Sequence, residues 1–166
     1  QHMDHHTHVD HAVSDCTSRE HYKGILADHA RGVFTGSVLM RAGAMRSDAA
    51  QTNHNLLLSD DAVVNTRPQL EIHADDVKAA HGATVGRLDA EAQFYLQQRG
   101  LSANEARSLL TFAYADEVLA SVPEDTREAV GRRVRAWLER VSWCSLTCAH
   151  NSRRWRRRFT ASPSCT

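Results

Sequence analysis

The sequence predicts a chain whose first half is a coiled, solenoid-like sheet of short strands and whose second half is helical. Before Asp89, short β-branched or apolar runs alternate with turn residues, and after it apolar residues recur with helical spacing. No Asn-Gly or Asp-Gly pair lies between the runs, and the lack of such tight turns favours strands that wind onward over hairpins. An antiparallel sandwich is the competing arrangement.

Five runs are expected to form strands because they are rich in β-branched and apolar residues and are separated by turn residues. They are GVFTGSVLM at 32–40, HNLLLS at 54–59, AVVNT at 62–66, QLEIHA at 69–74 and ATVGRL at 83–88. Their spacing is irregular, so the sequence indicates no fixed repeat length.

Three helices are expected after the strands. The first begins at Asp89, a suitable N-cap, and ends before Gly100, which suits a left-handed C-terminal stop. Ser102 and Glu105 have the spacing of a capping box that opens the second helix, which Pro123 ends. The third helix is marked by apolar positions at helical spacing: Val130, Val134, Trp137, Leu138 and Val141.

This pattern divides the chain into a strand region at 1–88, a helical domain at 89–141 and a disordered basic tail at 142–166. The tail is rich in serine, threonine and arginine, has no acidic residue and shows no apolar periodicity. It also holds three of the four cysteines, all of which are expected to be thiols.

Composition limits the class of protein. The chain has 166 residues, enough for one ordinary domain with a core. No apolar run approaches the roughly 20 residues that cross a bilayer, and no secretory signal is recognisable, so a cytoplasmic location is expected.

The charge balance differs between the body and the tail. The 20 bases and 20 acids cancel, but five arginines lie at 153–158, and without them 15 bases face 20 acids, a net charge of minus five. A mildly acidic body argues against a body that binds nucleic acid.

His81 is the strongest candidate for a metal- or cofactor-binding residue. It opens the segment HGATVG at 81–86, shortly after the run TRPQLEIHADDVK at 66–78. The small residues Gly82, Ala83 and Gly86 leave the imidazole uncrowded, so that a partner or a metal can approach closely. The alternative is a structural role, in which the ring hydrogen-bonds a turn.

Other histidines and cysteines are weaker candidates. Strand alternation would put His6, His8 and Asp10 on one face as a three-ligand set, although a solvated role is favoured. Cys144, Cys148 and His150 form a CxxxC-x-H cluster without a fourth ligand. There is no GxxxxGK[ST] phosphate loop and no Ser/His/Asp order, so no catalytic residue is predicted and the chain is not expected to be an enzyme.

Six motifs follow one another along the chain. They are His11 with CTSRE at 16–20, VFTG at 33–36, SDAAQTNHNLLL at 47–58, TRPQLEIHADDVK at 66–78, HGATVG at 81–86 and FYLQQRG at 94–100. In this order they resemble the C-terminal portion of SufD-like chains, which belong to the SufB/SufD family of the SUF iron–sulfur cluster assembly system. One such match could arise by chance, but six in order are specific.

The resemblance implies a right-handed parallel β-helix, present in part, followed by a helical domain. It implies a scaffold that acts with a SufB-like subunit and with a SufC-like ATPase, the latter bound by residues 89–141. His81 is implied as a ligand of a nascent iron–sulfur cluster shared with the SufB-like subunit. Many chains of the family have a cysteine two residues before this histidine, whereas this chain has Ala79. The resemblance therefore implies that the partner supplies more of the cluster ligands.

Two classes of function stay open on the sequence. The first is this assembly scaffold. The second is a binding module whose tail, Arg153 to Arg158, contacts nucleic acid or an anionic surface by charge and by stacking of Trp155. The second requires binding that weakens steeply with salt and disappears when residues 142–166 are removed.

Overall fold

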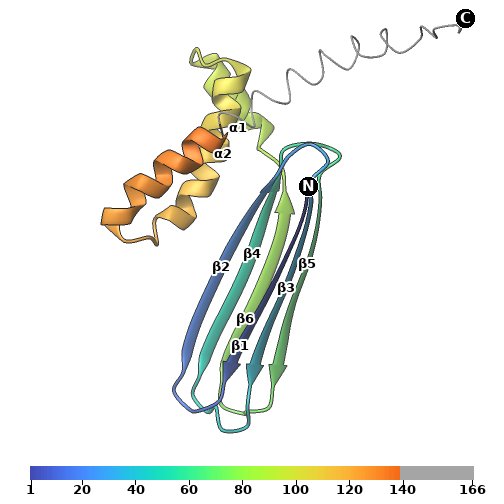
Figure 1. The fold of residues 1–166 in the computed structure, drawn as a ribbon, viewed down its shortest axis with the longest axis vertical. Helices are drawn as coiled ribbons and strands as arrows, with labels where there is room; N and C mark the ends of the chain where they lie inside the picture. Colours follow the sequence, from blue (N-terminus) through green and yellow to red (C-terminus); the bar gives the residue numbers. More distant parts are fainter. Residues whose placement is uncertain (139–166) are drawn as a thin grey trace, which may run out of the picture. The chain divides into compact units, whose positions relative to one another are not determined.

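A computed structural model describes residues 1–138 of the chain. The chain divides into two compact units, and the second unit begins at Glu91. The first unit contains all the described strands and the second contains the helices (Figure 1).

Six strands form two parallel sheets in the first unit. One sheet has the order β1-β3-β5 and the other the order β2-β4-β6, so consecutive strands alternate between the sheets (Figure 1). The strands are β1 (His2–His11), β2 (Thr17–Leu26), β3 (Arg31–Met40), β4 (Asp48–Leu57), β5 (Val63–Ile72) and β6 (Lys78–Gly86). This β-helix-like arrangement confirms strands that wind onward, and the antiparallel sandwich is excluded because every described pair is parallel.

A coil is here one strand of each sheet with its connections, and successive coils have similar lengths, which the sequence did not reveal. Residues pair with partners 29 positions later between β1 and β3, 32 between β3 and β5, 31 between β2 and β4, and 30 between β4 and β6. The irregular spacing of the five predicted runs therefore reflects their incomplete strand bounds and not the length of the coils. Polar inner residues such as Gln51 and Asn53 interrupt the apolar alternation and hide the repeat.

Several strand boundaries also differ from the prediction. The runs at 62–66 and 69–74 are one strand, β5, which passes through Pro68. Proline removes a ladder donor, and it is tolerated here because β5 is an outer strand of its sheet. β4 begins at Asp48 and β6 at Lys78, earlier than expected, and neither β1 nor β2 was among the predicted strands.

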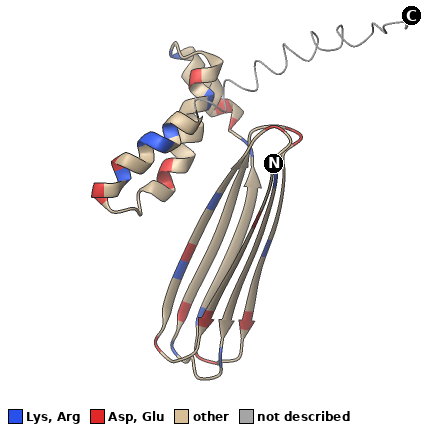
Figure 2. Ribbon diagram, viewed as in Figure 1, with Lys and Arg blue, Asp and Glu red and all other residues tan. Residues whose placement is uncertain are grey.

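The core lies at one end of the middle coil, which contains β3 and β4. Val38, Met40, Ala44 and Ala49 are almost fully buried, and Val9, Leu70, Val77 and Ala79 pack against them. The two middle strands carry Asp, Glu, Lys or Arg only at their first residues, Arg31 and Asp48 (Figure 2). Small and apolar side chains between two flanking coils therefore supply most of the burial.

Arginine–aspartate pairs join successive coils at their ends. Arg41 contacts Asp10 at 2.6 Å, Arg46 contacts Asp15 at 2.7 Å, and Arg19 contacts Asp48 at 2.8 Å. Each hydrogen-bonded guanidinium holds the pKa of its aspartate below the ordinary value.

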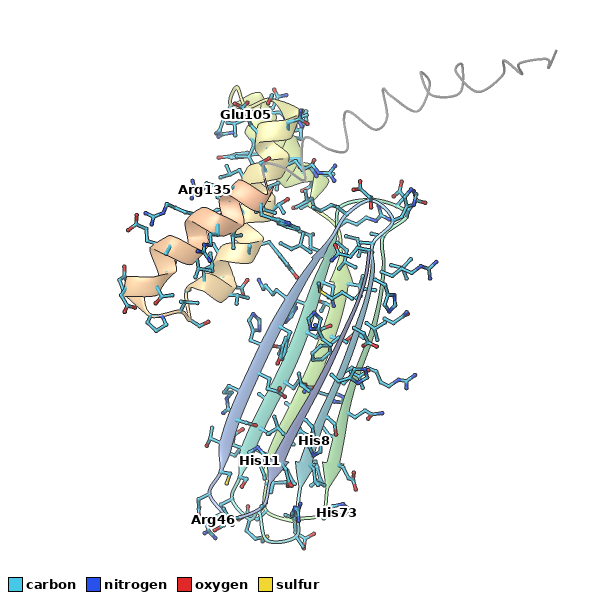
Figure 3. The ribbon with its side chains drawn as sticks, viewed as in Figure 1. His8, His11, Arg46, His73, Glu105 and Arg135 are labelled. Carbon is cyan, nitrogen blue, oxygen red and sulfur yellow. The ribbon has the colours of Figure 1, made fainter. Side chains whose placement is uncertain are left out.

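Arg46 also links a third coil, because its backbone N–H donates to Asp76 O. Figure 3 shows Arg46 at the same end of the strand unit as His11 and His73. Arg46 adopts a φ of 58°, and Asp15 in the coil before it adopts 60°, so equivalent corners use the same left-handed turn.

The helical unit begins close to where the sequence predicts it. Helix α1 (Ala90–Gln98) ends with Gly100 at a φ of 93°. The Gly100 N–H donates to Gln97 O and the Leu101 N–H to Leu96 O, which together form a Schellman stop.

Helix α2 (Ala103–Leu119) opens with the predicted capping box of Ser102 and Glu105. A further helix at 124–138 confirms the third predicted helix as far as the described residues reach. It packs on α2, with Arg127 3.5 Å from Asp116 and the Arg135 guanidinium 4.2 Å from the Phe112 ring centre. Among the described helices, none combines the length and apolarity needed to cross a membrane.

Candidate functional site

His81 lies within strand β6 and not at a turn. Its register partner on β4 is Gln51, and β6 continues through Gly86. The strand expected at 83–88 therefore begins earlier and includes His81, and the glycines and alanines of HGATVG remain extended in a parallel ladder. The strand fixes the backbone of His81 much more firmly than a loop would.

The surroundings of His81 are open. The side chain is exposed, and β6 is an outer strand of its sheet among the described residues. A Cβ added at Gly82 or at Gly86 would meet no atom within 4 Å. These glycines therefore relieve no crowding inside the chain, and because they alternate with His81 along β6, the open space at their positions lies on the face opposite the imidazole.

His81 belongs to an inner row of the sheet. Glu20, Gln51 and His81 are register partners on β2, β4 and β6. Residues paired across parallel strands point to the same face, and Gln51 is only 1% exposed, so this row faces the inside of the coil. His81 is exposed because it is the member of the row on the outer strand.

Ala79 is the nearest neighbour of His81 on the inner face, since side chains alternate along a strand. It is half-buried and packs against the core cluster that contains Val38 and Ala49. A thiol at this position would also have faced the interior, so the alanine removes a sulfur donor from the side that carries His81.

The described residues offer one donor at this place and not a complete metal site. No group of three or more histidine, cysteine, aspartate or glutamate side chains within residues 1–138 is arranged to hold a metal ion. An exposed imidazole on a strand can donate one nitrogen lone pair to a metal whose other ligands come from outside the described residues.

The N-terminal histidines do not assemble into the three-ligand set considered from the sequence. All of them lie on β1. His6 Nε2 is 3.1 Å from Asp4 Oδ1, and the Asp10 carboxylate is bound by Arg41. His11 is buried and its Nε2 is 2.8 Å from Ser18 Oγ, which gives it a structural position.

Cys16 is a half-buried free thiol whose Sγ is 3.8 Å from Ser14 O. The cluster of Cys144, Cys148 and His150 and the arginine-rich segment at 153–158 lie outside the described residues.

Two inner residues were missed as functional candidates, Gln51 and Glu20. Gln51 Nε2 donates a 2.7 Å hydrogen bond to Glu20 Oε2. Both residues lie in motif segments, Glu20 in CTSRE at 16–20 and Gln51 in SDAAQTNHNLLL at 47–58, but only the 30-residue and 31-residue register places them in the row of His81. A repeat length read from the sequence would have been the signal that could find them.

The helical unit exposes aromatic side chains. Phe94 is 63% exposed and Tyr95 53% exposed on α1, and the Arg99 guanidinium lies 3.5 Å from the Tyr95 ring centre. Trp137 is 45% exposed on the helix at 124–138. Burial and the nearby Glu117 raise the pKa of Tyr114 to about 12, so this phenol stays protonated.

These features define a β-helix-like arrangement of parallel strands with a helical unit and an exposed histidine on an outer strand, and within residues 1–138 no group of three or more histidine, cysteine, aspartate or glutamate side chains could hold a metal ion. Residues 1–114 match the family model described as SUF system FeS cluster assembly, SufBD core domain. The chain therefore belongs to the SufBD family.

Individual relatives agree with the family match. The iron–sulfur cluster assembly protein SufD of Escherichia coli (strain K12) is 42% identical over 119 residues, which cover 72% of this chain and 28% of the relative. A SufBD family protein of Synechocystis sp. is 46% identical over 102 residues, 61% of this chain and 22% of the relative. SufD of Bacillus subtilis (strain 168) is 35% identical over 100 residues, 60% of this chain and 23% of the relative. The chain thus spans about a quarter of the length of these relatives.

Proposed function

We propose that this chain is a scaffold for iron–sulfur cluster assembly and that His81 supplies one ligand to a nascent cluster shared with a SufB-like subunit. In this proposal the six strands are the end of a right-handed parallel β-helix. The observation that carries the proposal is an exposed imidazole held on an outer strand of its sheet.

Ligand chemistry supports this role for His81. A neutral imidazole binds iron, and it can complete a cluster whose remaining ligands are thiolates. Because Ala79 supplies no sulfur, the thiolate ligands come from the SufB-like subunit, whereas the sulfide is part of the cluster itself. The cluster is the cargo of the assembly and is passed on.

The outer strands support contact with a partner at the same place. β5 and β6 are the last strands of their sheets in the described chain, so one edge of each carries backbone groups without a strand neighbour. Such edges readily accept another strand. A SufB-like subunit that extends the sheets beyond β6 brings its own side chains next to His81.

Residues 89–141 are proposed to bind a SufC-like ATPase. The exposed aromatic side chains of this segment support the proposal, since aromatic residues are enriched at protein interfaces. The described residues contain no phosphate loop of their own, so ATP hydrolysis belongs to the partner.

The ATPase contact is tested by size-exclusion co-elution of the full chain with a SufC-like ATPase. Phe94→Ser with Tyr95→Ser removes the exposed aromatics of α1 while leaving its capping intact, and loss of co-elution is expected. Removal of residues 142–166 should leave the complex whole. Co-elution that requires the tail, or that falls steeply with salt, would support the nucleic-acid or anionic-surface module instead.

The role of His81 is tested by iron and sulfide content. The chain is reconstituted with a SufB-like subunit and the SufC-like ATPase, and bound iron and acid-labile sulfide are measured per complex. His81→Ala should lose cluster while the complex stays assembled. His73→Ala is the matched control, because His73 is also exposed and follows β5 in the same last coil. Equal cluster content in both variants would exclude His81 as a ligand.

A further inference from the structure

The amide of Gln51 is held in one orientation. A carboxylate only accepts hydrogen bonds, so the group that faces Glu20 Oε2 at 2.7 Å must be the Gln51 nitrogen. The amide oxygen is thereby turned away from Glu20. It is buried, and within the described residues it has no hydrogen-bond partner.

Gly36 on β3 fixes the amide from the opposite sheet. A Cβ added at Gly36 would lie 2.5 Å from Gln51 Nε2 and 2.6 Å from Gln51 Oε1. The amide therefore lies flat against the Gly36 backbone, and it cannot swing toward β3 to find another partner.

The next polar side chain in the row is His81. It is the register partner of Gln51 on β6, and its ring forms no hydrogen bond or ion pair with the described residues. A buried carbonyl oxygen without a donor is costly, and a ring N–H without an acceptor lies one strand away on the same face.

We propose that Gln51 is a positioning residue for His81: its Oε1 accepts a hydrogen bond from one ring N–H of His81, either after the exposed ring turns toward β4 or through one water. The bond completes a chain from the Glu20 carboxylate through the Gln51 amide to the imidazole. It selects one tautomer and leaves the lone pair of the other ring nitrogen for a ligand. This lone pair then binds iron, a step that rests on the cluster-binding function proposed above.

The tautomer is read directly by nitrogen-15 NMR of the histidine rings in the full chain without metal, at a pH where the ring is neutral. His81→Gln assigns the signals of His81 among the 11 histidines. In the wild type the two ring nitrogens should give widely separated shifts, one typical of N–H and one of a bare nitrogen. In Gln51→Met the separation should shrink, because both tautomers are then populated.

Two further variants separate positioning from packing. Asn53→Leu removes a buried amide from the neighbouring inner row of β4, and it should leave the His81 shifts unchanged. The exchange of Glu20→Gln together with Gln51→Glu keeps a donor on β2 and an acceptor on β4, and it should restore the wide separation. If Gln51→Met fails to fold, Glu20→Gln alone frees the amide to turn round and should also shrink the separation.

The proposal is overturned if the wild-type shifts already resemble those of free histidine, or if Gln51→Met and Glu20→Gln both leave them unchanged. The cluster experiment is independent of this result. Shifts that respond to Gln51 together with full cluster content in His81→Ala would retain the positioning and reject the ligand role. Shifts that do not respond to Gln51, together with loss of cluster in His81→Ala, would retain the ligand role and reject the positioning.

Discussion

Replacing Gly36 by alanine should destabilise the strand unit strongly, because the new methyl group occupies the place of the Gln51 amide. The Cβ would lie 2.5 to 2.6 Å from three side-chain atoms of Gln51, closer than van der Waals contact permits. The amide must move, and the hydrogen bond that it donates to Glu20 is lost.

The size of the effect follows from these two changes. Overpacking costs about 1–3 kcal/mol, and losing a hydrogen bond to a charged group costs about 1.5–3 kcal/mol. The conformational gain from replacing glycine in a strand offsets about 0.5–1 kcal/mol of this cost. The free energy of unfolding should therefore fall by about 2–5 kcal/mol.

Urea unfolding followed by circular dichroism measures this change. Gly43→Ala is the matched control, since a Cβ there would meet only Ala12 O at 3.5 Å, and its free energy of unfolding should match the wild type within about 0.5 kcal/mol. In a Gln51→Ala background the cost of Gly36→Ala should largely vanish. A Gly36→Ala chain with wild-type stability, or a cost that persists without the Gln51 amide, would refute this packing argument.

Three further outcomes are expected. The pKa of Asp15 is lower in the folded chain, so its ion pair with Arg46 stabilises the fold above the unfolded pKa of Asp15, and this stabilisation is lost as the pH falls through the folded pKa. Acid should therefore lower the urea midpoint less in Arg46→Gln than in the wild type. Ser102→Ala should cost about 1 kcal/mol of helical-unit stability by loss of the N-cap, seen in thermal unfolding, and an unchanged midpoint would contradict the capping box. Gly100→Ala should cost roughly 1 kcal/mol because of its positive φ, whereas alanine at Gly43 should not.

The helical half was predictable because its signals are local. An N-cap and a Schellman glycine act within one turn of chain, so Ser102, Glu105 and Gly100 could be interpreted without knowing the tertiary fold. The same holds for the onward winding of the strands, which the absence of tight hairpin turns indicated.

The strand half was predicted only in part because its signals are non-local. A solenoid interior is buried between coils about 30 residues apart, and here it accepts Gln51, Asn53 and Asn55 in place of large apolar side chains. Asn55 Nδ2 donates to Asn53 Oδ1 at 2.6 Å, which lets these amides satisfy each other inside. No apolar alternation marks such a strand, so β4 was shortened in the prediction.

His81 was identified as a candidate by its motif, but its setting required the structure. The strand expected at 83–88 began two residues after His81, whereas β6 begins at Lys78 and includes it. Its inner row with Gln51 and Glu20 depends on register, and register within a solenoid follows from the coil length that the sequence did not disclose.

The central claim is that His81 binds iron of a cluster, and electron–nuclear double resonance tests it most directly. The chain is labelled with nitrogen-15 histidine, assembled with an unlabelled SufB-like subunit and the ATPase, and the reconstituted cluster is reduced. A strong nitrogen-15 coupling is expected in the wild type and in His73→Ala, and its loss is expected in His81→Ala. A reduced cluster without that coupling in the wild type, or a coupling that survives His81→Ala, would contradict the claim.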